Sequence, residues 1–362
     1  MSFVKERIGN LSTVTLAIIL IIALVISIVF AISIGVVEIP FEKVWHIVTY
    51  NIFYTLGIDL GGHDIWAHGS MYDIVWNIRS PRVFMAAIVG MTLALAGVVM
   101  QATVQNPLAD PYILGMSSGA SLGATLSIAG GVTGIGGMVF GEYAIAFFAF
   151  IGSFVSAIAV LALSSAGGKA TSVKLVLSGT IISSLLGAFS NLIVVLAADA
   201  EEMQELTYWL LGSFGAASWV KLGLPIVVLI IGILFFLTQS RALNTMLMGD
   251  DVATTLGIDL AKKRKIYVTM TALLTATAVC FCGVIGFVGL MIPHIVRALT
   301  GNNHWKLIPI SCLVGGIFMV FADLLARTIL PGGGELPIGI ITAVCGAPVF
   351  AYIMIKRTYS FS

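Results

Sequence analysis

The stretch GDDVATTLGIDLAKKRK, at residues 249–265, is the longest polar interruption in the second half of a strongly apolar chain. Asp250 and Asp251 suit the start of a helix, where free N–H groups and the helix dipole favour negative charge. Gly257 then breaks the turn, Asp259 is placed to cap a second helix, and four consecutive bases close the stretch. The pattern predicts two short helices against a membrane. They fit either a solvated basic connector or a docking surface for a cytoplasmic protein.

The composition of the chain decides its broad class. Of its 362 residues, 59% are hydrophobic and only 10% are charged, and the mean hydropathy is +1.08. A soluble domain of this size could not solvate such a surface, so the sequence predicts an all-α polytopic membrane protein. The four cysteines all lie inside apolar runs, which predicts free thiols that pack as small hydrophobes.

Nine apolar runs are each long enough to cross a hydrocarbon core of ~30 Å as a helix. They are Leu11–Val37, Val83–Val104, Tyr112–Ala129, Tyr143–Leu163, Leu175–Ala198, Val220–Thr238, Ile266–Ile292, Leu307–Leu330 and Ile338–Ile355. Basic residues near both termini place both ends in the cytoplasm, which requires an even number of crossings. Gly283, Gly286 and Gly289, followed by Pro293, mark where a helix would break and turn back. Splitting the run there predicts ten transmembrane helices.

The distribution of the 18 basic residues agrees with this topology, because most of them fall on the predicted cytoplasmic side. The external exceptions are Lys43, Arg79, Arg82, Lys221 and Arg327. Pro81 is predicted to start the second span. The external stretch 38–82 is expected to lie along the membrane as a loop, and 199–219 to contain a short amphipathic helix.

The third span carries glycines at three positions, each four residues from the next: Gly115, Gly119 and Gly123. Small residues at this spacing let two helix backbones approach closely within a membrane. The pattern predicts a tight contact between this span and a neighbouring helix.

Few side chains offer chemistry of their own. His63, Asp64 and His68 could ligate a metal, but an ordinary solvated turn fits their glycine-rich surroundings better, and no metal site is predicted. Gly167–Lys169 lacks the residues of a nucleotide-binding loop. Apart from Asp323, the spans hold hardly any acids of the kind that proton- or sodium-coupled carriers use. These absences disfavour a gradient-driven secondary transporter and a membrane enzyme, and they indicate that energy comes from a partner.

Seven motifs occur in order along the chain. They are RSPR at 79–82, QNPLADP at 105–111, LGMSSGASLGA at 114–124, YWLLGSFG at 208–215, LG at 256–257, GFVGLMIPHIVR at 286–297 and ELPIGIITAVCGAPVF at 335–350. With these motifs the chain resembles the FecCD-type permease subunits of ABC importers for iron-siderophore complexes, haem or cobalamin.

The resemblance implies an ABC importer type II permease fold with one transmembrane domain, residues 1–362, and coupling helices at 249–265. It implies a second permease subunit (identical or paralogous), two ATPase subunits, an extracytoplasmic substrate-binding protein and a location in the cell membrane. No cofactor is expected on this chain, since ATP and Mg²⁺ would bind the ATPase, and no nucleic acid is expected. The implied cargo is an iron complex, either a ferric siderophore or haem, with cobalamin as the alternative.

The resemblance also implies roles for individual residues. The ATPase-coupling residues are Gly249, Asp250, Asp251, Ala253, Leu256 and Gly257. The arginines that would receive glutamates of the binding protein are Arg79, Arg82 and Arg327. The cytoplasmic gate would contain Asn106, Leu108, Thr171 and Ser172. The translocation path would be lined by Ser183, Asn191 and Thr342.

Overall fold

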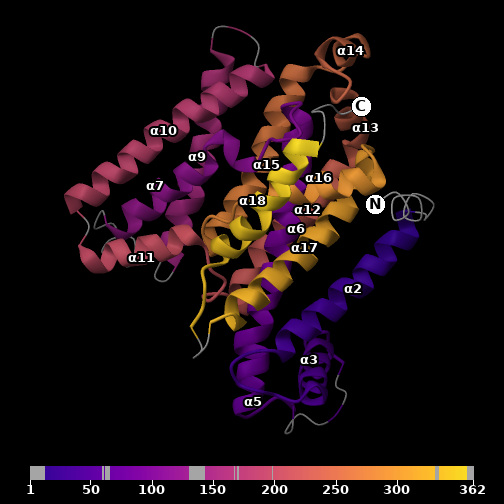
Figure 1. Ribbon diagram of the computed structural model, residues 1–362, viewed down its shortest axis with the longest axis vertical. Coiled ribbons are helices and arrows are strands. Elements are labelled where there is room, and N and C mark those ends of the chain that lie inside the picture. The colour runs from indigo at the N-terminus through magenta and orange to yellow at the C-terminus, as the bar shows by residue number, and fades with distance from the viewer. Residues whose placement is uncertain are drawn as a thin grey trace.

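A computed structural model describes residues 13–58, 61, 66–129, 143–166, 168, 171–197, 199–330 and 334–356, and every regular element in these ranges is helical (Figure 1). The elements are α2 (Thr13–Ser33), α3 (Phe41–Thr55), α5 (Ser70–Tyr72), η1 (Asp73–Arg79), α6 (Ser80–Thr103), η2 (Pro111–Leu114), α7 (Met116–Ile128), α9 (Ala144–Ser165), α10 (Ser172–Ala197), α11 (Ala200–Leu211), α12 (Trp219–Thr238), α13 (Ser240–Met246), α14 (Asp250–Thr255), α15 (Leu260–Cys282), α16 (Val288–Thr300), α17 (His304–Thr328) and α18 (Ile338–Lys356).

Within the described residues, seven helices are long and apolar enough to cross a membrane. Six of these are α2, α9, α10, α12, α15 and α17. The seventh is the continuous helix Ser70–Thr103, which comprises α5, η1 and α6. The apolar helices α16 and α18 are shorter by this measure, and α7 has 13 residues. The prediction of an all-helical polytopic membrane protein is therefore confirmed, whereas the count of ten spans stays a prediction.

Helix α6 occupies the centre of the bundle, where almost all of its residues are buried (Figure 1). It is apolar on every side, as expected for a helix surrounded by others. Gly90 of α6 meets the backbone of Gly315 on α17, and Gly97 meets that of Gly289 on α16. Any larger residue at these glycines would collide with a carbonyl group, so two neighbouring helices pack directly on the α6 backbone.

The predicted glycine contact forms between α7 and α9. A Cβ atom at Gly119 would collide with the carbonyl oxygen of Gly152, and one at Gly123 with that of Phe148. Gly115 has a φ of 72° and begins α7 in the left-handed conformation, and a Cβ atom there would lie 2.9 Å from the hydroxyl oxygen of Ser156 on α9. All three glycines therefore lie at the contact that their spacing predicted.

The chain breaks after α15, as the glycines predicted. Gly283 has a φ of 71°, and Phe287 begins α16 with a φ of 68°. A side chain at Gly283 would collide with the carbonyl oxygen of Trp209. Pro293 lies inside α16 instead of at the break.

Two expectations about the external segments need correction and one is confirmed. Residues 41–55 form the regular helix α3 in the stretch expected to be a loop. Pro81 lies in the first turn of α6, but the span does not start there, because the continuous helix that contains α6 begins at Ser70. The amphipathic helix α11 is present as expected, and Asp199 caps it by accepting hydrogen bonds from the N–H groups of Glu201 and Glu202.

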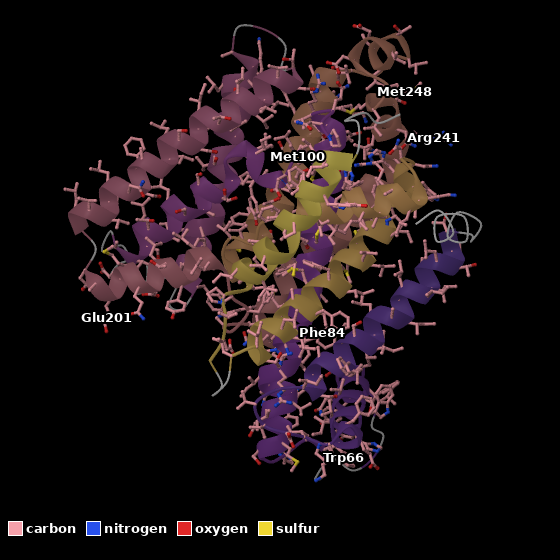
Figure 2. All side chains as sticks on the ribbon, in the orientation of Figure 1. Trp66, Phe84, Met100, Glu201, Arg241 and Met248 are labelled. Carbon is pink, nitrogen blue, oxygen red and sulfur yellow. The ribbon has the colours of Figure 1, made fainter. Side chains whose placement is uncertain are left out.

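The bundle has two chemically different ends (Figure 2). Met248 and Arg241 mark the end that carries α13 and α14, and Trp66 marks the end that carries α3 and α5. We refer to these as the α14 end and the α3 end.

Replacing Gly119 with Ala should lower the midpoint of thermal unfolding in detergent, because the added methyl group meets a backbone oxygen that cannot move away alone. Such overpacking costs about 1–3 kcal/mol. Gly187→Ala in α10 is the matched control, since a Cβ there has no atom within 4 Å. Equal midpoints for the two variants would contradict the tight contact between α7 and α9.

Candidate functional site

The stretch 249–265 forms one short helix and the beginning of a long one. Gly249 (φ 102°) and Gly257 (φ 84°) bracket the six-residue α14. The second helix was expected to be short, but α15 runs from Leu260 to Cys282 without interruption. Asp259 caps it as predicted, accepting the N–H of Lys262 at 3.0 Å. The short helix that accompanies α14 is α13, which precedes it in the chain.

The outer face of this segment is apolar and exposed. Met248, Val252 and Leu256 are 63%, 40% and 63% exposed, whereas Ala253 packs inward without any exposed surface. Three exposed apolar side chains on one short segment make this face a candidate surface for a partner. Asp251 is exposed beside them.

Asp250 instead points inward, where it meets the buried Arg264 of α15. The two Nη atoms of Arg264 donate to the two carboxylate oxygens of Asp250 at 3.0 and 2.7 Å. Nη2 also donates to the hydroxyl of Ser172 at 2.8 Å, and Nε donates to the carbonyl of Thr103 at 3.3 Å. One guanidinium group thus joins α14, the start of α10 and the end of α6.

Gln105 adds a second connection to the same carboxylate. Its side-chain amide donates to Asp250 and to the carbonyl of Met246, both at 2.7 Å. The backbone of Gln105 is left-handed, with a φ of 52°, directly after α6 ends. We call Gln105, Ser172, Asp250 and Arg264 the Arg264 cluster.

The four consecutive bases at 262–265 do not share one environment, because Arg264 is only 2% exposed. Helical spacing explains its position. Tyr267, Val268 and Thr271 form the buried face of α15, and Arg264 lies on that face one turn earlier. Extending the spacing of this face backwards from the apolar part of the helix would have placed Arg264 inside.

The predicted gate residues lie next to this cluster. The Asn106 side chain accepts the N–H of Leu108 at 2.9 Å and so closes a tight turn immediately after Gln105. Burial raises the pKa of the Asp110 carboxyl in the same loop to about 6. Thr171 is exposed just before α10, and Ser172 is a member of the cluster.

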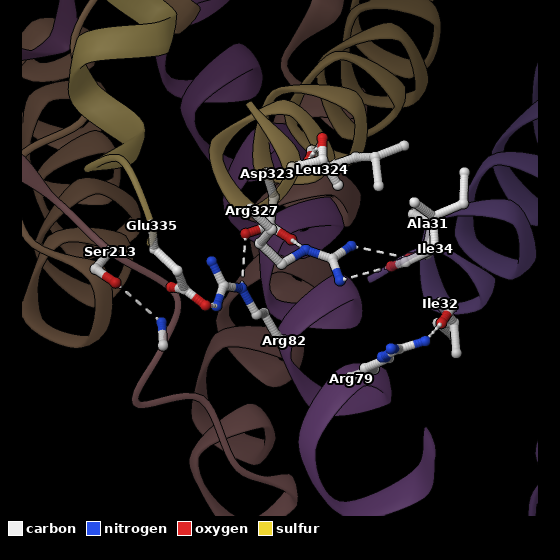
Figure 3. Close-up of polar contacts among 12 residues, drawn as sticks. Ala31, Ile32, Ile34, Arg79, Arg82, Ser213, Asp323, Leu324, Arg327 and Glu335 are labelled. Carbon is white, nitrogen blue, oxygen red and sulfur yellow. Dashed lines mark hydrogen bonds and ion pairs between the residues drawn. The ribbon is translucent and has the colours of Figure 1, made fainter. Parts of the chain in front are cut away.

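At the α3 end, Arg82 lies between two carboxylates (Figure 3). Its Nε donates to Asp323 at 2.8 Å, and its Nη1 donates to both carboxylate oxygens of Glu335 at 2.7 Å. Arg327 pairs with the other oxygen of Asp323 at 3.0 Å. Arg82, Asp323 and Arg327 are buried, whereas the Glu335 side chain is 47% exposed.

Arg327 and Arg79 also fasten the end of α2. Arg327 donates to the carbonyl oxygens of Ala31 (2.8 Å) and Ile34 (3.2 Å), and Arg79 donates to that of Ile32 (3.1 Å). The last carbonyls of a helix lack partners within it and carry partial negative charge, so two guanidinium groups stabilise this end.

The three arginines therefore do not form the open basic pockets expected for docking of a binding protein. Arg79, Arg82 and Arg327 are only 6%, 8% and 7% exposed. Sequence reasoning placed them at one end of the bundle but missed the partners of Arg82, because Asp323 and Glu335 lie more than 200 residues away from it in the chain.

The three predicted path residues do not share one environment. Ser183 is half-buried and Asn191 is exposed, both on α10. Thr342 of α18 is fully buried and donates to the carbonyl of Gly339 at 3.1 Å. Thr342 therefore has no exposed surface within one chain, and its place in the translocation path stays a prediction.

His63 and Asp64 of the weak metal candidate lie outside the described residues. Among the residues that the structure describes, no group of three or more metal-ligating side chains occurs. The four cysteines are free, as predicted.

Comparisons with known proteins relate this chain to a family of membrane transport proteins. The model of the FecCD transport family matches residues 21–356. The cobalamin import system permease protein BtuC of Halobacterium salinarum is 40% identical, over 78% of this chain and 74% of the relative. The hemin transport system permease protein HmuU of Yersinia pestis is 33% identical, over 83% of this chain and 89% of the relative.

One solved structure resembles the whole bundle. It is described as a metal-chelate type ABC transporter in an inward-facing conformation and is 29% identical, with a TM-score of 0.77. The match covers 95% of this chain and 99% of that one. The chain therefore belongs to the FecCD transport family, and it is a multi-pass membrane permease of the ABC importer type, not an enzyme.

Proposed function

We propose that this permease carries an iron complex, either a ferric siderophore or haem, across the cell membrane. The observation that carries the proposal is the match of the whole bundle to a structure described as a metal-chelate type ABC transporter. The similarity to a hemin transport permease favours the same class of cargo. A gradient-driven carrier is set aside, because the family consists of ABC permeases.

Cobalamin is the second candidate cargo. A permease named for cobalamin import is 40% identical to this chain, which is higher than the 33% identity of the hemin permease. Both candidates are metal complexes held in a large organic ligand, so they require the same kind of wide pathway.

Uptake into proteoliposomes distinguishes these cargoes. The permease, its ATPase and its binding protein are reconstituted with ATP, and ferrichrome, haemin and cyanocobalamin are offered at equal concentration. We expect ATP-dependent accumulation of one of the iron complexes at least tenfold above that of cyanocobalamin. Preferred uptake of cyanocobalamin would select the second candidate, and uptake independent of ATP would contradict the importer mechanism.

We propose ten membrane crossings with both termini and the α14 end in the cytoplasm. The seven long apolar helices together with α7, α16 and α18 supply ten. The lysines of the 262–265 run at the α14 end support this orientation through the positive-inside rule. Accessibility of single cysteines from the two sides of the membrane measures the topology.

We propose that a second copy or a close paralogue completes the pathway along α10 and α18. Only 11% of the apolar window of α10 is buried within one chain. Leu177, Ile181 and Leu185 of α10 and Val344 of α18 are exposed, alternating with polar groups such as Asn191. An apolar surface with interspersed polar groups suits a subunit interface that also conducts a large cargo.

At the α14 end, we propose that one of two ATPase subunits, which bind ATP and Mg²⁺, contacts α14 through Val252, Leu256 and the exposed Asp251. Closure of the two ATPase subunits would move α14. This movement would change the side of the membrane to which the pathway is open. Gly249 and Gly257 set the angle of α14, because both adopt left-handed backbone conformations.

Replacing Gly257 with Leu should uncouple ATP hydrolysis from uptake while membrane insertion persists. Space is not limiting, since a Cβ there has no atom within 4 Å, but a φ of 84° costs a non-glycine residue about 1–2 kcal/mol. Gly257→Asn is the control, because Asn adopts this conformation more readily than Leu. Equal uptake per ATP in both variants would remove α14 from the ATPase contact.

At the α3 end, we retain only Arg82 as a docking arginine for the binding protein. Its present partner Glu335 is half-exposed, so a glutamate from the binding protein could replace it, whereas Arg79 and Arg327 are committed to α2. Exchange of one carboxylate for another would keep Arg82 neutralised throughout docking.

Replacing Glu335 with Gln should therefore strengthen binding of the binding protein a few-fold at low salt, because a charged competitor is removed. The effect should fade at high salt, which screens exposed charges. Glu205→Gln on the exposed part of α11 is the control for the change in net charge. Surface plasmon resonance measures both, and an equal gain from the two variants would remove Arg82 from the docking site.

A further inference from the structure

We propose that the Arg264 cluster is the mechanical link that transmits movement of α14 directly to the ends of α6 and α10, with Arg264 as its positioning residue. This inference rests on the proposed contact between α14 and the ATPase. It assigns a function to a side chain that touches neither the cargo nor, in this structure, the outer surface.

The first argument is that little else holds α14 to the bundle. Among its six residues only Ala253 is buried. A groove of about 550 Å³ lies between α14 and the start of α15, and Asp250, Thr254, Ile258 and Arg264 are among the residues that line it. The packing of Ala253 and the polar contacts of Asp250 therefore attach the helix to the rest of the bundle.

The second argument is the geometry of that attachment. The two parallel hydrogen bonds between Arg264 and Asp250 fix the relative orientation of the two groups, not only their distance. Two further N–H groups of Arg264 donate to the carbonyl of Thr103 and the hydroxyl of Ser172. A lysine could not make these contacts together, because it presents one compact charge in place of a planar fork.

The third argument is the strained backbone of Gln105. Non-glycine residues in the left-handed region persist where surrounding contacts hold them, and they gather at functional and switching segments. Here the contacts are the hydrogen bonds from the Gln105 side chain to Asp250 and Met246. Displacement of α14 would remove them, and the strained turn of Gln105, Asn106 and Leu108 would be free to relax.

Together these contacts connect α14 to two other helices. Ser172 connects it to α10, and Gln105 with Thr103 connects it to the end of α6. The residues predicted to form the gate, Asn106, Leu108, Thr171 and Ser172, all lie in or beside these two connections. A push on α14 therefore reaches Gln105 through one hydrogen bond and Ser172 through two, by way of Arg264.

The functional test compares three variants in the reconstituted transporter, using the cargo that the wild type accumulates. Arg264→Gln removes the guanidinium group and its two parallel hydrogen bonds to Asp250. Ser172→Ala removes only the connection to α10. The matched control is Lys265→Gln, one position further along α15, at an exposed side chain. The readout is the number of ATP molecules hydrolysed per cargo molecule, which a change in the amount of folded protein alone does not alter.

We expect this ratio to rise at least tenfold in Arg264→Gln and about threefold in Ser172→Ala, and to match the wild type in Lys265→Gln. Ser172→Ala decides the matter if Arg264→Gln fails to fold. A wild-type ratio in folded Ser172→Ala would overturn the connection to α10, and a wild-type ratio in folded Arg264→Gln would overturn the link as a whole.

A measurement without ATPase or cargo separates this inference from the proposed function. Spin labels at Val252 and Val173, which are 40% and 67% exposed, report the distance from α14 to α10 in nanodiscs, in a background without native cysteines. Arg264→Gln and Ser172→Ala should broaden the distance distribution and Lys265→Gln should not. Unchanged distributions would refute the link even if ATP-driven uptake occurs, and broadening without such uptake would refute only the proposed function.

Discussion

Charge buried among apolar helices must be neutralised and hydrogen-bonded, because no water is present to solvate it. Arg82, Arg264 and Arg327 satisfy this requirement by reaching across the chain, and each one joins segments that are far apart in sequence. The buried arginines therefore do more than occupy space between helices. They determine which helix ends stay together, and the ends of helices are where a permease must open and close.

The bundle combines firm and weak attachments. The backbone of α6 is in direct contact with α16 and α17 at Gly97 and Gly90, so this core can shift only as a unit. By contrast, α14 is attached to the other helices by the packing of Ala253 and the hydrogen bonds of Asp250. Segments with few buried contacts are those that move at the lowest free-energy cost. A stiff centre with a lightly attached helix at one end is suited to converting a local push into a change at distant helix ends.

Much of the architecture could be predicted from the sequence, because membrane helices reveal themselves by length and hydropathy. The break at Gly283, the contact at Gly119 and the cap at Asp259 each follow from a local rule. The environments of Arg82 and Arg264 could not be predicted by treating basic residues as a surface property. The partners of Arg82 come from α17 and the segment before α18, and only the assembled bundle brings them together. For Arg264 the signal existed in the spacing of the buried face of α15, but the run of four bases concealed it.

The attachment of α2 has a consequence for how this protein can change over evolutionary time. Arg79 and Arg327 recognise carbonyl oxygens, which every amino acid presents alike, so the identity of most side chains at the end of α2 is irrelevant to the contact. Gly35 is the exception, since a side chain there would occupy the space of the Arg79 guanidinium group. The first helix can therefore diverge in sequence while its end remains anchored at the same point of the bundle.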